Sequence, residues 1–224
     1  MKKLFVSLAV LFSAAVVGQS PIKKDLGEFN ELKAYDLINV ELIKSSKNRI
    51  EISGDNMHDV EIVNKNGLLK IKMDIDEIFD GNKTYVKLYH SGLDIIDANE
   101  GAYISSDDKF KQYELTLRAQ EGGQINVQCK VTEAEIKAVT GGIIQLTGSA
   151  DHQDINVNTG GSFKGKEFKT ERTHVSIRVG GEADVNASQL VDVKIRVGGD
   201  VYIYGDPETV NESRALGGRI KRMD

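Results

Sequence analysis

The sequence predicts an all-β protein: a right-handed parallel β-helix, a solenoid of about 19-residue coils, with an N-terminal β region that covers its first coil. Three observations predict this. The composition has 22 glycines but only two prolines and no tryptophan, which indicates many tight turns within regular structure. Glycine pairs recur at a nearly constant interval, and alternating apolar residues flank each pair.

The glycine pairs define the repeat. Their successive intervals are 19, 19, 20, 18 and 19 residues, and the pairs contain 12 of the 22 glycines. Because glycine has no Cβ, it can adopt positive φ and lets successive turns stack closely. We therefore expect each pair to be a structural corner between two sheets. The pairs begin at Gly122, Gly141, Gly160, Gly180, Gly198 and Gly217.

Apolar residues keep the same step as the glycines, as a stacked core requires. In a parallel β-helix each coil lies about 4.8 Å above the previous one, so equivalent inward side chains contact each other. A propeller blade would need about 40 residues, which excludes that repeat. We assign residues 89–224 to the β-helix. One such apolar column is Ile125, Ile144, Phe163, Ala183, Val201 and Ile220.

The two preceding segments differ from the repeats. Residues 1–18 have Lys2 and Lys3 before an apolar run of about 14 residues, which is typical of a cleavable signal peptide and too short to span a bilayer. Residues 19–88 lack glycine pairs but alternate like strands, and Asn66-Gly67 is a hairpin signal. We therefore expect an exported protein in the periplasm, on the outer-membrane surface or outside the cell, with no membrane span after cleavage.

Composition and motifs exclude several functions. Without Lys2 and Lys3 the chain has 27 basic and 34 acidic residues, a net charge of −7, so nucleic acid is a poor partner. Cys129 is the single cysteine, which excludes an internal disulfide and indicates a buried apolar role. We predict no catalytic residue, metal site or cofactor, because no catalytic signature is present and the histidines are isolated, as expected for surface or loop positions. These histidines are His58, His90, His152 and His174.

The chain resembles a family of small exported bacterial proteins common in Bacteroidetes, called putative autotransporter adhesin, head GIN domain. The resemblance rests on FNELKAYDLINVELIKS, RIEISGD and DVEIVNKNGLLKIKM, followed by the glycine-paired coils. It implies a β-helical fold, an exported location and an adhesin-like role. It supplies no catalytic residues.

A basic column is the first candidate binding surface. Arg118, Lys137, Asn156, Arg178, Arg196 and Arg214 follow the repeat and are expected to point outward. Stacked cations repel unless an anion lies beside them, so an acidic glycan is one predicted ligand, with Arg178, Arg196 and Lys194 as its contacts. The alternative is that neighbouring carboxylates neutralise the column as exposed ion pairs. The expected neighbouring column is Thr116, Glu135, Asp154, Ser176, Lys194 and Glu212.

Two further features suggest partners. Tyr202 and Tyr204 alternate with inward residues, so their rings could stack on sugars. The last coil ends in a charged edge, RIKRMD, which either discourages stacking or permits a homo-oligomer. The sequence favours a non-enzymatic adhesin-like or ligand-binding module of the cell envelope, with a surface glycan or a host or cell-surface protein as partner. The alternatives are a self-assembling periplasmic structural protein and, less favoured, a polysaccharide-degrading β-helix enzyme.

Overall fold

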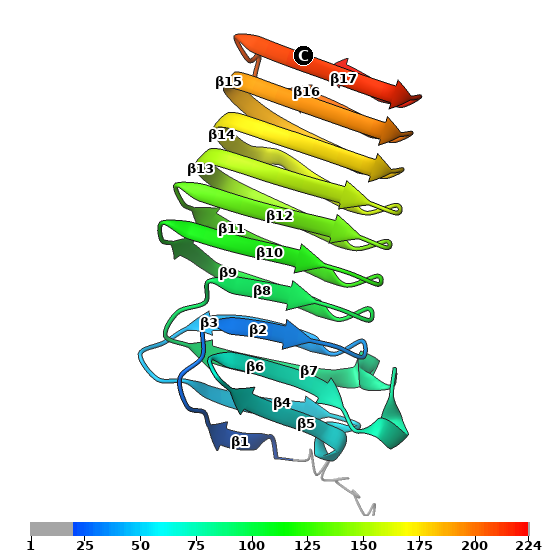
Figure 1. Ribbon diagram of the computed structural model, residues 1–224. Helices are drawn as coiled ribbons and strands as arrows, with labels where there is room; N and C mark the ends of the chain where they lie inside the picture. The colour runs from blue at the N-terminus through cyan, green and yellow to red at the C-terminus, as the bar shows by residue number, and fades with distance from the viewer. Residues whose placement is uncertain (1–19, 224) are drawn as a thin grey trace, which may run out of the picture.

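Each coil of the computed structural model, which describes residues 20–223, adds one strand to each of two facing sheets (Figure 1). The chain winds upward in the right-handed sense, which confirms the predicted β-helix. We call the sheet nearer the viewer in Figure 1 the front sheet and the other the back sheet. Three single turns of 3-10 helix, η1 (Met57–Asp59), η2 (Ile75–Glu77) and η3 (Gly81–Lys83), lie in the N-terminal part.

Both sheets run the length of the solenoid. From the N-terminal end, the front sheet contains β5 (Val60–Lys65), β6 (Leu68–Met73), β2 (Glu31–Ala34), β8 (Ile95–Ala98), β10 (Glu114–Ala119), β12 (Glu133–Val139), the second halves of β13 (Ile143–Asn158), β14 (Ser162–Val179) and β15 (Glu182–Val197), and β17 (Thr209–Leu216). The back sheet contains β1 (Ile22–Asp25), β4 (Arg49–Gly54), β7 (Thr84–His90), β3 (Asn39–Lys44), β9 (Tyr103–Lys111), β11 (Gln124–Lys130), the first halves of β13 to β15, β16 (Asp200–Tyr204) and β18 (Arg219–Arg222).

The core lies between the sheets and is built from stacked inward columns. Alternation in each strand sends every second side chain inward, and the parallel register places equivalent residues above one another. Full burial of each aliphatic side chain contributes about 1.5–3 kcal/mol. One fully buried column is Ile96, Leu117, Ile136, Ile155, Val175 and Val193.

The N-terminal region does not stack in sequence order. Strands β2 and β3 form a rung directly below β8 and β9, and β6 and β7 pair below them in parallel. Antiparallel strands β5, β4 and β1 then close the lower end. Strands β2 and β3 are therefore an interior rung of the solenoid, although they come early in the chain, whereas β1 lies at its lower edge.

The last described coil carries charged side chains at inward positions. Glu212 and Arg214 occupy inward register positions, opposite the buried Val193 and Ile195 of the coil below. Their side chains form an ion pair across 3.9 Å. Arg222 likewise lies opposite the buried Ile203. Within residues 20–223, these charged inward positions end the apolar columns.

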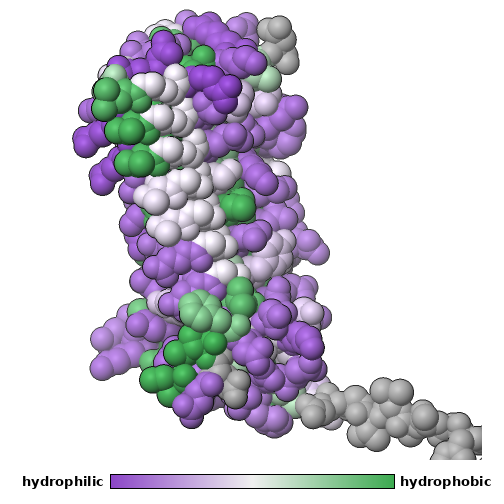
Figure 2. Space-filling view, turned by 90° about the vertical axis from the view of Figure 1, so that its right-hand side faces the viewer, coloured by the Kyte–Doolittle hydropathy of each residue, from purple (hydrophilic) through white to green (hydrophobic). Residues whose placement is uncertain are grey.

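The glycine corners lie at the edge that faces the viewer in Figure 2, and they have two geometries. In the first three pairs, the residue before the pair also has positive φ, as at Thr140 with φ 49°. In the last three, both glycines have positive φ and the preceding residue does not. Those preceding residues are Val179, Val197 and Leu216, and β-branched or bulky side chains resist positive φ. The two residues with positive φ therefore lie one position further along the chain, relative to the glycine pair, in the last three corners.

This shift exposes a row of apolar side chains, which we call the corner ladder. Val179, Val197 and Leu216 lie opposite one another in successive coils. Their exposed fractions are 52%, 45% and 68%. They form the green column near the top of Figure 2.

Candidate functional site

The outer face of the front sheet carries the predicted cations, but in a different register. Asn156 pairs with Ser176, and Ser176 pairs with Lys194, so the predicted step from Asn156 to Arg178 is wrong. The observed step of 20 residues equals the interval between Gly160 and Gly180, whereas the predicted step was 22 residues. Arg214 is also not in the outward column, because it faces the core end beside Ile195.

Three outward columns replace the predicted two. The acidic column is Thr116, Glu135, Asp154, His174, Asp192 and Asn211. The basic column is Arg118, Lys137, Asn156, Ser176, Lys194 and Ser213. The corner column is Gln120, Val139, Asn158, Arg178, Arg196 and Ala215.

The corner column places Arg178 and Arg196 side by side, about 4.8 Å apart at the backbone, with no carboxylate in their own column. Asp192 is four residues before Arg196, or about 13 Å along the strand. That separation exceeds the Debye length of about 8 Å at physiological ionic strength. The carboxylates of the acidic column therefore neutralise these two arginines only weakly.

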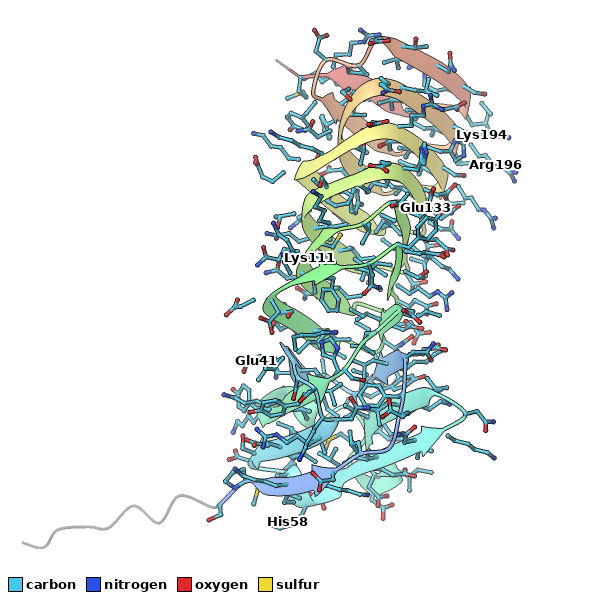
Figure 3. The ribbon with its side chains drawn as sticks, turned by 90° about the vertical axis from the view of Figure 1, so that its left-hand side faces the viewer. Glu41, His58, Lys111, Glu133, Lys194 and Arg196 are labelled. Carbon is cyan, nitrogen blue, oxygen red and sulfur yellow. The ribbon has the colours of Figure 1, made fainter. Side chains whose placement is uncertain are left out.

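Lys194 lies two residues before Arg196 on the same outward face, and Figure 3 shows both side chains projecting from the same side of the solenoid. The ion pairs found among residues 20–223 all involve other side chains. The structure thus brings Arg178, Arg196 and Lys194 together as one unpaired cationic cluster.

A groove of about 460 Å³ adjoins this cluster on the front sheet. Lys137 and Arg178 form parts of its wall, while the shorter Val139, Asn156 and Asn158 leave the space between them. The Asn158 Oδ1 is buried and accepts no hydrogen bond from another described residue. The groove therefore offers two cations, amides and an unmet acceptor, with the Glu135 carboxylate at the end farther from the cluster, and the end beside Arg178 suits an anionic, hydroxyl-rich ligand.

The predicted tyrosines lie on the opposite sheet. Tyr202 and Tyr204 point outward from β16, and both are half-buried. The Lys166 ammonium lies 5.1 Å from the centre of the Tyr204 ring, so one face of that ring is already covered. The tyrosines and the cationic cluster do not form one site.

One histidine prediction is wrong. His90 is buried, with 1% of its surface exposed, because it occupies the last inward position of β7 and stacks on Phe110 at 5.6 Å. Burial, aided by Lys44 and opposed by Asp108, lowers the His90 pKa to about 4. Neither ring nitrogen has a hydrogen-bond partner in residues 20–223.

The burial of Cys129 is confirmed, and burial raises its pKa to about 12. Across residues 20–223, no three His, Cys, Asp or Glu side chains are placed to hold a metal ion. The helices of this part are short turns, and none has the length and apolarity of a membrane span. The predicted signal peptide, residues 1–18, lies outside the described residues.

Sequence reasoning missed the corner ladder. Its signal was the residue before each glycine pair, which changes from Glu or Thr in the first three pairs to Val or Leu in the last three. In the last three corners the two residues with positive φ are the glycines themselves, one position later than in the first three. The residue before the pair is therefore turned outward.

Comparison with known proteins identifies the family. The family model described as "Putative auto-transporter adhesin, head GIN domain" matches residues 28–207. The chain belongs to this family. The match to the GIN-domain family covers the N-terminal rungs and the coils through β16, including the cationic cluster. No curated protein matches the chain.

Solved structures with the same fold are distant in sequence from this GIN-domain chain. A putative adhesin from Bacteroides fragilis NCTC 9343 is 18% identical with a TM-score of 0.81, covering 92% of this chain and 98% of the other. A putative adhesin from Parabacteroides merdae ATCC 43184 is 19% identical with a TM-score of 0.71, covering 92% and 96%. A protein described as a putative lipid binding protein from Parabacteroides distasonis ATCC 8503 is 18% identical with a TM-score of 0.67, covering 92% and 98%. At these identities the likeness establishes the fold.

Proposed function

We propose that the protein is an exported, non-enzymatic binding module of the cell envelope that recognises an acidic glycan. The observation that carries this proposal is the unpaired cluster of Arg178, Arg196 and Lys194 beside the groove of about 460 Å³. Guanidinium groups bind carboxylates and sulfates through paired hydrogen bonds, and a groove along a rigid sheet can follow a linear chain. Membership of a family described as adhesins agrees with a binding role.

Binding to acidic polysaccharides tests this proposal. Polygalacturonate, alginate and chondroitin sulfate are offered at low and moderate salt, with neutral dextran as the comparison. Because each lost arginine removes a charge-assisted contact, the R178S/R196S double variant should bind about tenfold more weakly. Equal binding by the wild type and this variant would refute the proposal.

The matched control removes the same charge from the other side of the molecule. Lys111 and Lys130 are exposed cations that pair with each other in register on the back sheet. The K111S/K130S double variant therefore has the same net charge as R178S/R196S. It should keep most of the binding, which distinguishes a local site from general attraction.

Location requires its own measurement. Antibody labelling of intact and permeabilised cells distinguishes the outer surface from the periplasm. Labelling of intact cells would support adhesion to a glycan outside the cell. Labelling only after permeabilisation would restrict the ligand to the periplasm and leave host adhesion untenable.

A second candidate function is contact with a lipid surface, which the corner ladder favours. Val179, Val197 and Leu216 are exposed in a row, and Arg178 and Arg196 directly precede two of them. Apolar side chains beside cations suit a bilayer interface with anionic headgroups. Flotation with phosphatidylglycerol vesicles should then decrease in a V197S/L216S variant, whereas phosphatidylcholine vesicles should bind little. Absence of flotation with both vesicle types would exclude this function.

A further inference from the structure

A second groove crosses the outer face of the back sheet near the N-terminal end. It has a volume of about 430 Å³ and lies over β4, β7, β3 and β9, which pair side by side. Its size falls within the range typical of small-ligand sites. The groove is separate from the cationic cluster, because Figure 3 shows Glu41, which lines it, on the opposite side of the solenoid from Lys194 and Arg196.

Two tyrosines flank the centre of this groove. Asn39 lies opposite Tyr85 on one side and opposite Tyr103 on the other, so the tyrosines are two strand spacings apart, about 9.6 Å at the backbone. The Tyr85 side chain projects into solvent, with 55% of the residue exposed. Tyr103 is half-buried. The pair therefore bounds a gap that is open to solvent.

Asn39 keeps the gap open. Its amide nitrogen donates to the carbonyl oxygen of Asn82 at 3.2 Å, which holds the side chain toward η3. A second, longer contact of 3.5 Å reaches the carbonyl oxygen of Thr84. With the nitrogen committed to the backbone, the Oδ1 remains as the acceptor that the side chain can offer to a ligand.

The charges at the groove cancel. Glu41 and Lys87 face each other on β3 and β7 and form an ion pair across 3.6 Å. They therefore add polarity without net charge, which distinguishes this groove from the cationic one on the front sheet. The hydroxyl groups of Ser105 and of the two tyrosines add further donors and acceptors at its margin.

We propose that this groove binds a neutral sugar ring of a glycan chain between Tyr85 and Tyr103. Carbon contacts are optimal at about 3.5–4.0 Å, so a pyranose ring stacked between two aromatic faces needs about 8 Å between them. The backbone spacing of about 9.6 Å allows this with a small inward lean of the rings. The apolar faces of the sugar stack on the tyrosines, and its hydroxyl groups reach Asn39 and Ser105.

The test uses the full-length protein with four neutral polysaccharides: dextran, mannan, laminarin and galactomannan. Retardation in native gels containing each polysaccharide gives the affinity, and tyrosine fluorescence gives an independent titration because the chain has no tryptophan. We expect at least one of the four to bind. The Y85A/Y103A variant should bind it about tenfold more weakly, since two stacking contacts are lost. The Y85F/Y103F variant keeps both ring faces and should retain most of the affinity.

Two controls complete the design. Tyr113 is 69% exposed and lies outside this groove, so the Y113A variant should bind as the wild type does. An S105W variant fills the groove without removing either tyrosine and should also abolish binding in native gels, the assay used for it because the added tryptophan would mask tyrosine fluorescence. Unchanged circular dichroism of both variants excludes a folding defect. Binding by R178S/R196S should be unchanged, so failure of the acidic-glycan proposal and failure of this one are separable. Absence of binding to all four polysaccharides, or wild-type affinity in Y85A/Y103A, would overturn the inference.

Discussion

Acidification should destabilise the fold through His90. The folded-state pKa is about 4, and the value for an exposed histidine is 6.5. Because the folded pKa is the lower one, the unfolded chain takes up the proton first as the pH falls. The contribution of neutral His90 is therefore complete above pH 6.5 and is lost progressively between pH 6.5 and about 4. Each pH unit in this window costs about 1.4 kcal/mol.

At pH 5.0 the loss from His90 alone is therefore about 2 kcal/mol relative to pH 7.5. Urea unfolding followed by circular dichroism at the two pH values measures it. The H90F variant replaces the imidazole with a ring that can also stack on Phe110 and cannot titrate. Its loss of unfolding free energy between the two pH values should be about 2 kcal/mol smaller than that of the wild type. An H58N variant, which changes an exposed histidine, should behave as the wild type does. Equal pH dependence in H90F and the wild type would refute the assignment.

Three further predictions concern the corners, the thiol and the C-terminal end. A Cβ at Gly142 would lie 2.0 Å from a backbone oxygen of the coil below, so the G142A variant should have a free energy of unfolding in urea lower by more than about 2 kcal/mol. The G92A variant, with open space around the added Cβ, should unfold with nearly the wild-type free energy. Buried Cys129, with its pKa raised to about 12, should resist iodoacetamide at pH 8 in the folded protein and react only after unfolding; rapid labelling of native protein would contradict its burial. An E212V/R214V variant should extend the apolar columns to the open end and cause concentration-dependent association in sedimentation velocity, and a monomer at every concentration would show that these charges do not block stacking.

The glycine period predicts the coil because it reports a local requirement of the backbone. Each corner needs residues without a Cβ at a fixed place in the turn, and the sequence displays that need directly. Cys129 could be placed in the core because a free cysteine behaves as a small apolar residue, and the burial pattern of β11 agrees with this.

The lateral arrangement of the outward side chains was predicted less well. The pairing of Asn156 with Ser176 follows the 20-residue interval from Gly160 to Gly180, whereas the predicted column took a step of 22 residues to Arg178. The sequence shows the total length of a coil but not how it is divided between the two sheets. His90 was misplaced because the prediction rested on the polarity and isolation of the histidines, although the alternation of Val86 and Leu88 with Lys87 places His90 on the inward face.

The position of β2 and β3 has a consequence for the order in which the protein can assemble. Most coils pair with a neighbour about 19 residues away, whereas Leu32 must meet Leu69 and Ile96, which are 37 and 64 residues further along the chain. Closing longer loops costs more chain entropy and slows the contacts that depend on them. A chain emerging from its N-terminus can therefore pair β2 with β6 only after residue 71, and the other edge of β2 stays open until β8 ends at residue 98. The later coils, by contrast, can add one at a time to a template that is already complete.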